Sequence, residues 1–300
     1  MLSVVSHVVA ADGTDILVRH WRAAGAETGG AWAGRPWASV LLVHGLGEHS
    51  GRYERVGDQM AVAGLDVHAY DHRGNGGSGG RRGHVDRWSQ HHDDLQERLR
   101  AVRAAAGGRP LVLYGHSLGG LVVLGYLLTE RPKPDLVVLS SPGLDSTLAS
   151  WKKALAQTLG RIVPTLAMSN GIDGATLSRD PTVARKVGED PLAGKSSTTR
   201  FGVEALKEQA RVRRDYAGLT LPTLVLHGLD DGLVPAEASA ILASLPNVER
   251  RTYAGLRHEL HNEPEGPAII DEIIAWIRHQ GRGATLDAQS NTASGERLAR

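Results

Sequence analysis

Short apolar runs alternate along this chain with longer segments whose apolar residues recur every three or four positions. Such alternation predicts βαβ units, in which helices connect the strands of a parallel sheet. The predicted strands are 39–43, 65–70, 111–114, 136–140, 223–226 and 248–253, and the predicted helices are 53–63, 89–106, 118–128, 237–245 and 268–280. We therefore expect an α/β fold with a mostly parallel sheet flanked by helices.

Two regions depart from this alternation. At the N-terminus, the extended segments Val4–Val9 and Ile16–Trp21 flank an Asp-Gly pair, which predicts an antiparallel hairpin at one edge of the sheet. Residues 142–219 contain no convincing strand, so we interpret them as a helical cap inserted over the carboxyl edge of the sheet.

The core domain is then formed by residues 1–141 and 220–280. Residues 281–300 are polar, and we expect them to be a disordered tail.

Composition narrows the chemistry that this fold can carry. The 34 Lys and Arg residues nearly balance 33 Asp and Glu residues, which argues against a nucleic-acid binder. The chain has no cysteine, which excludes disulfides, thiolate nucleophiles and iron–sulfur clusters.

Residues 1–11 lack the features of a signal peptide, and no apolar stretch approaches the length of a membrane span. We expect a soluble, cytoplasmic protein.

A sharp turn is predicted between the strand at 111–114 and the helix at 118–128. It carries Gly115-His-Ser-Leu-Gly119, a Gly-x-Ser-x-Gly motif in the strand-to-helix setting that a nucleophile elbow requires. The flanking glycines let the backbone crowd together, so that the Ser117 hydroxyl projects above the sheet. Ser117 is therefore the predicted nucleophile.

Acyl transfer also needs two backbone N–H groups directed at the oxygen that becomes negative. One belongs to the residue after the nucleophile, here Leu118. The other comes from a loop after an early strand, and here that loop is His-Gly-Leu-Gly at 44–47. Glycines on both sides of Leu46 let the loop curl towards Ser117, so we predict the Leu46 N–H as the second donor.

An acid and then a base should follow the nucleophile along the chain. The loops after the last two strands offer Asp230 or Asp231, and His258 or His261. We favour Asp231, because the loop has room to turn before it and Asp230 then occupies the turn. We favour His258, because it lies nearer the end of its strand. Asp145 is a weaker candidate acid.

The predicted triad is thus Ser117, Asp231 and His258. Asp231 orients His258 and stabilises its imidazolium form. His258 removes the proton of Ser117 and later donates it to the leaving group.

Three other patterns in the sequence resemble binding sites, but their context does not support a bound cofactor, metal ion or anion. Gly-Asn-Gly-Gly-Ser-Gly at 74–79 resembles a dinucleotide motif, but no helix follows it, so no such cofactor is expected. His91 and His92 would point about 100° apart on a helix, which predicts a solvated helix start rather than a metal site. We expect Arg73, Arg81, Arg82 and Arg87 to lie in a solvated loop.

Several motifs occur in a characteristic order: His44–Tyr53 (HGLGEHSGRY), Asp71–Ser78 (DHRGNGGS), Gly115–Gly120 (GHSLGG), Ser178–Asp180, Asp190–Pro191, His227–Asp231 (HGLDD) and His258–Glu263. Together they resemble the monoacylglycerol lipases of the α/β-hydrolase superfamily. The resemblance covers residues 4–280, and GEHSGRY is its most specific part.

This resemblance implies hydrolysis of monoacylglycerols to glycerol and a fatty acid, without a cofactor or metal, under a hydrophobic cap that can sit on membranes. It implies the same site residues: Ser117, Asp231, His258, and the N–H groups of Leu46 and Leu118. Three departures bear on substrate preference. Asn75 replaces a usual His, Leu118 stands where many members have Met, and residues 193–199 are small and polar where cap contacts are expected.

Apolar residues recur through the first part of the predicted cap, at Leu144, Leu148, Trp151, Leu155, Leu159, Ile162 and Leu166. Such a stripe normally packs on the domain below it. Above an active site it can also receive an acyl chain and dock on lipid. We expect Trp151 and residues 162–168 to line an acyl tunnel, with a transient membrane-surface contact through the cap.

The expected function is a serine hydrolase that cleaves lipid esters through an acyl-enzyme on Ser117. The alternatives are a general carboxylesterase or a lysophospholipase. A cofactor-free haloperoxidase or a non-enzymatic receptor of the same fold is a weaker alternative.

Overall fold

The computed structural model describes residues 3–24, 35–147 and 158–297, with side chains described to residue 281. Its centre is an eight-stranded sheet in the order β1-β2-β4-β3-β5-β6-β9-β10. These strands are β1 Val4–Val9, β2 Asp15–Trp21, β3 Ala38–Val43, β4 Leu65–Tyr70, β5 Leu111–His116, β6 Leu136–Ser140, β9 Thr223–Gly228 and β10 Val248–Tyr253. Neighbours are parallel from β4 to β10, and β1 and β2 form an antiparallel edge. The predicted fold class is confirmed.

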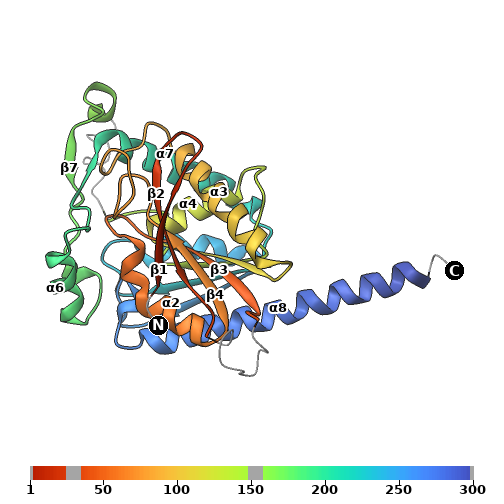
Figure 1. Cartoon of the computed structure of the whole chain (residues 1–300). Coiled ribbons are helices and arrows are strands. Elements are labelled where there is room, and N and C mark those ends of the chain that lie inside the picture. The colour runs from red at the N-terminus through yellow and green to blue at the C-terminus, as the bar shows by residue number, and fades with distance from the viewer. Residues whose placement is uncertain (1–2, 25–34, 148–157, 298–300) are drawn as a thin grey trace.

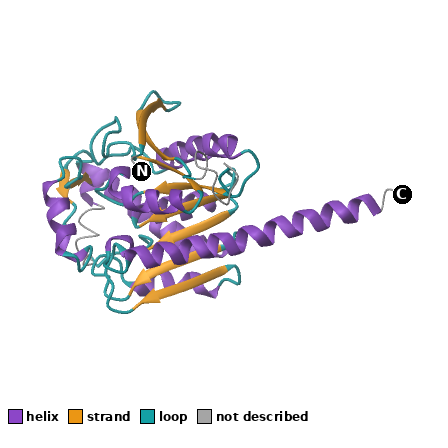
Figure 2. Ribbon diagram, turned by 60° about the horizontal axis from the view of Figure 1, so that its bottom comes forward, coloured by secondary structure: helices purple, strands orange, loops and turns teal. Residues whose placement is uncertain are grey.

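Helices cover both faces of the sheet (Figure 1). The helices α3 Ser89–Ala106, α4 Leu118–Leu127 and α7 Thr199–Asp215 lie on one side, and α2 Glu54–Val62 and α8 Gly266–Arg297 lie on the other. Strand side chains alternate between the two layers, as the two-residue period of a strand requires. In β5, Leu113 packs with α3 and α4, whereas Val112 and Tyr114 pack with α2 and α8. Figure 2 shows α8 in front of the sheet, running along its strands.

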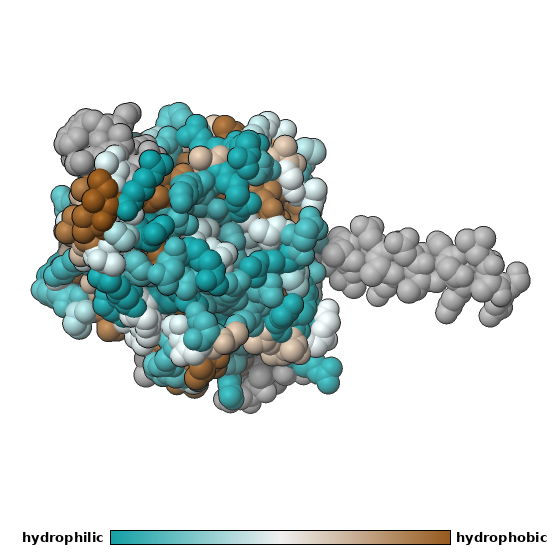
Figure 3. Space-filling model, turned by 90° about the horizontal axis from the view of Figure 1, so that it is seen from above, coloured by the Kyte–Doolittle hydropathy of each residue, from teal (hydrophilic) through white to brown (hydrophobic). Residues whose placement is uncertain are grey.

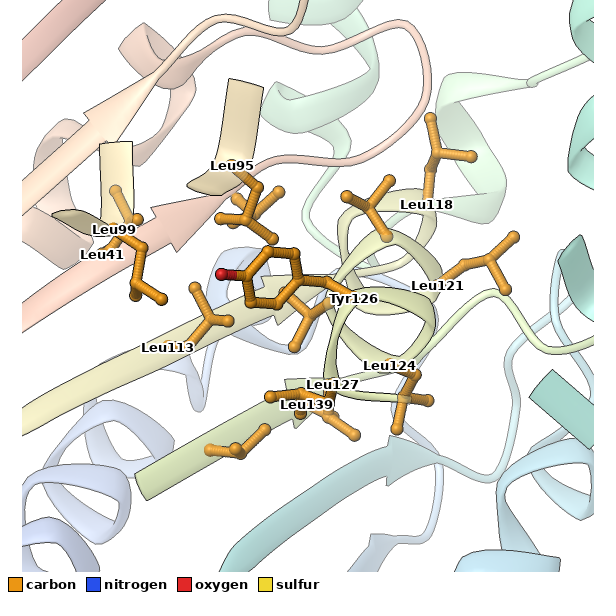
Figure 4. Close-up of a cluster of buried hydrophobic side chains, with 14 of the residues drawn as sticks. Leu41, Leu95, Leu99, Leu113, Leu118, Leu121, Leu124, Tyr126, Leu127 and Leu139 are labelled. Carbon is orange, nitrogen blue, oxygen red and sulfur yellow. The ribbon is translucent and has the colours of Figure 1, made fainter. Parts of the chain in front are cut away.

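The helix α4 lies inside the protein, and every one of its residues is buried. A helix that is apolar on all sides belongs in a core. Figure 4 shows its leucines and Tyr126 among side chains from β3, β5, β6 and α3. This packing fixes the N-terminus of α4, which is the turn that carries Ser117.

The region predicted as a helical cap contains short strands that the sequence did not predict. The strand β7 Ala167–Ser169 pairs antiparallel with β8 Ser196–Thr198, and helix α6 Pro181–Glu189 lies between them in the chain. The expectation of a strand-free cap was wrong, because strands this short are set by their pairing partner. They show no apolar alternation, and every residue of β7 is exposed.

The apolar stripe expected in the cap does not form a single buried face. Leu144 is buried, whereas Ile162 and Leu166 are exposed. Leu148, Trp151 and Leu155 lie outside the described residues.

Two helical segments near the C-terminal end also differ from expectation. The helix expected at 237–245 is a 3₁₀-helix over Ala236–Ser244. Residues 281–297 continue α8 instead of forming a disordered tail, and α8 projects beyond the rest of the chain in Figure 1. A helix already nucleated by packing can be extended without a second nucleation step, which composition alone does not reveal. Among the described residues, no helix is long and apolar enough to span a membrane.

The burial of α4 predicts a strong asymmetry between two matched substitutions. Val123→Ala on α4 removes methyl groups from a fully buried position and should lower the free energy of unfolding by about 2 kcal/mol or more. Val62→Ala on α2, at a position 64% exposed, should change it by less than about 0.5 kcal/mol. Chemical denaturation measures both, and equal losses would contradict the packing described here.

Candidate active site

Ser117 occupies a strained turn between β5 and α4. Its φ of 50° and ψ of −118° lie in a region that residues with a side chain seldom adopt. The turn is held by hydrogen bonds from the Ser117 N–H to the Ser140 carbonyl at 3.0 Å and from the Gly143 N–H to the Ser117 carbonyl at 2.8 Å. The predicted strand-to-helix elbow is thus present, with Ser117 at the N-terminus of α4.

The glycines around Ser117 permit a very close backbone approach. A Cβ atom on Gly119 would lie 2.1 Å from the carbonyl oxygen of Val43, and one on Gly115 would lie 2.8 Å from the carbonyl oxygen of Gly119. Neither position can take a side chain without moving the backbone. The elbow therefore packs α4 directly against the end of β3.

Ser117, His258 and Asp231 form a hydrogen-bonded chain. His258 Nε2 lies 2.9 Å from Ser117 Oγ, and His258 Nδ1 lies 2.7 Å from Asp231 Oδ2. Asp231 follows β9 and His258 follows β10, so the parallel sheet brings both loops to the edge where β5 ends at the elbow. With the proton of neutral His258 on Nδ1, Nε2 can accept the hydroxyl proton of Ser117.

The carboxylate of Asp231 is fixed by several donors. Its Oδ1 accepts the backbone N–H groups of Leu233 at 2.8 Å and Val234 at 2.9 Å, and its Oδ2 also lies 3.2 Å from His227 Nε2. Burial disfavours the charged carboxylate, but the hydrogen bonds from His227 and His258 outweigh it and lower the pKa of Asp231 below its usual value. Asp231 is therefore a charged partner for His258 at neutral pH.

The candidates that were set aside lie in other surroundings. Asp230 is exposed, and Asp145 forms an ion pair with Arg213 at 3.0 Å. His261 is buried and stacks on Tyr53, with ring centroids 4.8 Å apart. Burial lowers the pKa of His261 to about 4, so its ring is neutral.

The two predicted N–H donors lie on segments that meet at Ser117. Leu118 is the first residue of α4, and the first N–H groups of a helix have no acceptor within that helix. Leu46 lies in the loop after β3. A Cβ atom added to Gly45, the residue before Leu46, would lie 3.2 Å from the Cβ of Ser117. The loop therefore runs directly beside the nucleophile.

A buried histidine holds this loop in place. His44 Nδ1 lies 2.8 Å from the Gly45 carbonyl oxygen, and His44 Nε2 accepts the backbone N–H of His72 at 2.9 Å. Burial lowers the pKa of His44 to about 4, so the ring stays neutral and Nε2 remains an acceptor.

A buried ionic cluster behind the triad was not predicted from the sequence. Arg52 contacts Glu259 at 2.8 Å and Glu48 at 3.3 Å, and the Tyr53 hydroxyl donates to Glu48 at 2.7 Å. Glu48 also accepts the Gly45 N–H at 3.3 Å, which connects the cluster to the loop that carries Leu46. The available signal was the GEHSGRY segment, which contains Glu48, Arg52 and Tyr53 but does not reveal that Glu259 joins them.

One arginine cannot neutralise two buried carboxylates equally. Burial raises the pKa of Glu48 to about 7. Burial also disfavours the charged form of Glu259, but the adjacent Arg52 outweighs this and holds its pKa below the usual range. For His258, burial opposes protonation, but the hydrogen bond and charge of Asp231 prevail and raise its pKa.

Ser141 is a second residue that the sequence analysis missed. It follows β6 with a φ of 45°, and its hydroxyl donates to the carbonyl of His258 at 2.9 Å. No motif marks it, because the contact joins residues 117 positions apart in the chain.

The cap region contacts the loop that carries Leu46. The Gly194 N–H donates to the Gly47 carbonyl at 3.0 Å, and His49 Nε2 lies 2.7 Å from Asp190 Oδ2. The backbone on one side of the candidate site is therefore tied to residues of the predicted cap.

The expected solvated loop of arginines holds for Arg81, Arg82 and Arg87, which are exposed, but not for Arg73. Arg73 is buried, with a bidentate ion pair to Asp94 at 2.7 and 2.6 Å and a contact to Asp12 at 2.7 Å. His91 and His92 are buried on α3 rather than solvated. Tertiary partners decided these placements, which local polarity cannot predict.

Comparison with known proteins gives consistent matches. The serine aminopeptidase S33 family matches residues 34–265. A monoacylglycerol lipase of Mycolicibacterium smegmatis is 34% identical over 249 residues, covering 81% of this chain and 88% of that protein. Human monoglyceride lipase is 31% identical over 283 residues, covering 90% of this chain and 89% of that protein.

A solved structure agrees with these sequence matches. The crystal structure of a Paleococcus ferrophilus monoacylglycerol lipase matches with a TM-score of 0.78 and 32% identity, covering 88% of this chain and 99% of that one. The predicted α/β-hydrolase architecture is confirmed.

The surroundings of His258 predict how it titrates. Its pKa should lie above the ordinary histidine value of about 6.5, because the charge of Asp231 stabilises the imidazolium. Asp231→Asn should lower that pKa, because it removes the negative charge that stabilises the imidazolium, while burial still favours the neutral ring. The exposed neighbour Asp230→Asn is the matched control and should leave it unchanged. NMR titration of the ring protons measures all three, and equal shifts in both variants would refute the assignment.

Proposed function

This chain belongs to the serine aminopeptidase S33 family, together with the monoacylglycerol lipases, and we propose that it hydrolyses monoacylglycerols with Ser117 as its nucleophile. The protein is a serine hydrolase of lipid esters, and the two relatives described above are a monoacylglycerol lipase and a monoglyceride lipase. One observation supports Ser117 most directly: its Oγ lies 2.9 Å from His258 Nε2, and His258 Nδ1 lies 2.7 Å from Asp231 Oδ2.

In the acylation step, Ser117 Oγ attacks the ester carbonyl carbon while its proton passes to His258 Nε2. The carbonyl oxygen becomes negative and accepts hydrogen bonds from the N–H groups of Leu46 and Leu118. The bond between the carbonyl carbon and the glyceryl oxygen then breaks. His258 gives its proton to that oxygen, so glycerol leaves and the acyl group stays on Ser117.

Deacylation repeats these roles with water as the nucleophile. Water attacks the acyl carbon, and its proton passes to His258. The bond to Ser117 Oγ breaks, Oγ recovers the proton, and the fatty acid leaves. Asp231 remains a carboxylate throughout and stabilises the imidazolium that forms in each step. No step requires a cofactor or a metal ion.

An apolar surface supports the choice of a lipid substrate. In the cap region Ile162 is 72% exposed, and Val163, Leu166 and Met168 are also exposed. Figure 3 shows apolar side chains gathered on the side of the molecule where β7 lies in Figure 1. A patch of this kind would contact lipid during substrate uptake. We extend the proposal to a cap over residues 142–219 that makes a peripheral contact with membranes.

The alternative function is a carboxylesterase or lysophospholipase that uses the same chemistry on another ester. Relative kcat/KM for monoacylglycerols, diacylglycerols, lysophospholipids and p-nitrophenyl esters of graded chain length separates these functions. A higher value for lysophospholipids would overturn the substrate proposal and leave the nucleophile proposal standing.

Substitution of the nucleophile is the direct test of the chemistry. Ser117→Ala should lower monoacylglycerol turnover by at least about 1000-fold, because only binding and the N–H donors would remain. Ser244→Ala, at an exposed position on the 3₁₀-helix Ala236–Ser244, is the control and should keep full activity. A fluorophosphonate probe should label the wild type and not Ser117→Ala. Hydrolysis retained by a folded Ser117→Ala protein would overturn the assignment.

The lipid contact has its own test. Ile162→Asp places a charge in the apolar patch and should reduce turnover of long-chain monoacylglycerol in vesicles, while hydrolysis of a soluble short-chain ester is retained. Val62→Asp introduces the same charge at an exposed valine on α2 and should reduce neither. An unchanged ratio of long-chain to short-chain turnover in Ile162→Asp would exclude the patch from lipid uptake.

A further inference from the structure

Two histidines and an aspartate converge on one face of the sheet, away from the candidate active site. His20 on β2 and His68 on β4 are directly paired across the strands. Asp66 lies two residues before His68, so its side chain is on the same face of β4. The two imidazole rings are stacked, with centroids 4.2 Å apart and planes at 9°.

Both histidines direct the same ring atom at the aspartate. His20 Nε2 lies 2.7 Å from Asp66 Oδ1, and His68 Nε2 lies 3.0 Å from Asp66 Oδ2. One ligand atom from each of the three residues lies within 4.8 Å of the others. The side chains are 29%, 19% and 13% exposed for His20, His68 and Asp66, so ions can reach them.

We propose that His20, Asp66 and His68 form a binding site for a divalent transition-metal ion of the Zn²⁺ type. Imidazole nitrogen together with carboxylate oxygen is a donor set that suits Zn²⁺, Ni²⁺ and Cu²⁺. Water would complete the coordination. The ion takes the place of the protons between the nitrogens and the carboxylate, and each neutral imidazole then keeps its proton on Nδ1.

The two histidines line a hollow of about 300 Å³ on the surface of the sheet. Arg98 also lines this hollow, and Glu97 lies 3.6 Å from its guanidinium.

A second group with similar donors does not support the same proposal. Glu48, His116 and Glu259 also lie close enough to share an ion, and all three are buried. Arg52 already pairs with both of those carboxylates. The guanidinium of Arg52 therefore already supplies the positive charge that a metal ion would bring to Glu48 and Glu259. The side chains of His20, Asp66 and His68, by contrast, are partly exposed to solvent.

The position of the proposed site indicates what a bound ion would do. His20 and His68 join the antiparallel hairpin to the parallel part of the sheet, where β2 meets β4. Asp66 and His68 lie in the first part of β4, whereas the active-site loops follow the carboxyl ends of the parallel strands. A bound ion would therefore stabilise the fold at this seam without entering ester hydrolysis.

Calorimetric titration of the full chain with ZnCl₂, after removal of metal with a chelator, tests the proposal. The wild type should bind one equivalent through this site, and its Tm should rise with Zn²⁺ because the ligand binds only the folded state. His20→Gln and His68→Gln should each weaken that binding by at least about tenfold, and the rise in Tm should disappear. His7→Gln is the matched control, since His7 pairs with a single carboxylate, Asp15, at 2.8 Å.

Asp66→Asn keeps the size of the side chain, so it tests the site even if the histidine variants fail to fold. It should also weaken Zn²⁺ binding while circular dichroism stays native. Zn²⁺ affinity and a rise in Tm that persist in all three variants would overturn the proposal, as would the absence of Zn²⁺ binding to the wild type. Short-chain ester turnover should be retained in each variant, so failure of the metal site does not count against Ser117.

Discussion

Ser117 presents its hydroxyl from a backbone with a φ of 50°, which the packing around the turn has to hold in place. A positive φ at a residue with a side chain persists only when its surroundings hold it there. Here the helix after it is buried on every side, and Gly119 brings that helix against the Val43 carbonyl. The free energy of core packing therefore holds the turn that presents the hydroxyl, and the order of the parallel strands brings the His258 and Asp231 loops to it.

Charge around His258 is arranged in two layers. Asp231 contacts the imidazole directly and raises its pKa, and its own charge is held by backbone N–H groups and His227. Behind them, Arg52 binds Glu48 and Glu259, and Glu48 also binds the backbone of the loop carrying Leu46. The same buried cluster thus supports the loop on one side of Ser117 and the segment that carries His258 on the other.

The predicted cap is joined to this centre rather than merely placed over it. Hydrogen bonds from Gly194 to Gly47 and between Asp190 and His49 tie it to the loop beside the nucleophile. Its apolar residues Ile162, Val163, Leu166 and Met168 are exposed. Through the pairing of β7 with β8, these contacts connect the residues proposed to meet lipid with the loop that holds one proposed N–H donor.

The sequence alone predicted the α/β class, the hairpin edge, the eight strands of the central sheet to within two residues, and the three residues that form the hydrogen-bonded chain at Ser117. These depend on local periodicity and on motifs whose residues are near in the chain. Tertiary structure decided the burial of Arg73, the pairing of β7 with β8, and the contacts of Glu259 with Arg52 and of Ser141 with His258. Each of these rests on a partner distant in sequence, and a polar residue or a three-residue strand carries no local sign of the partner that will satisfy its hydrogen bonds.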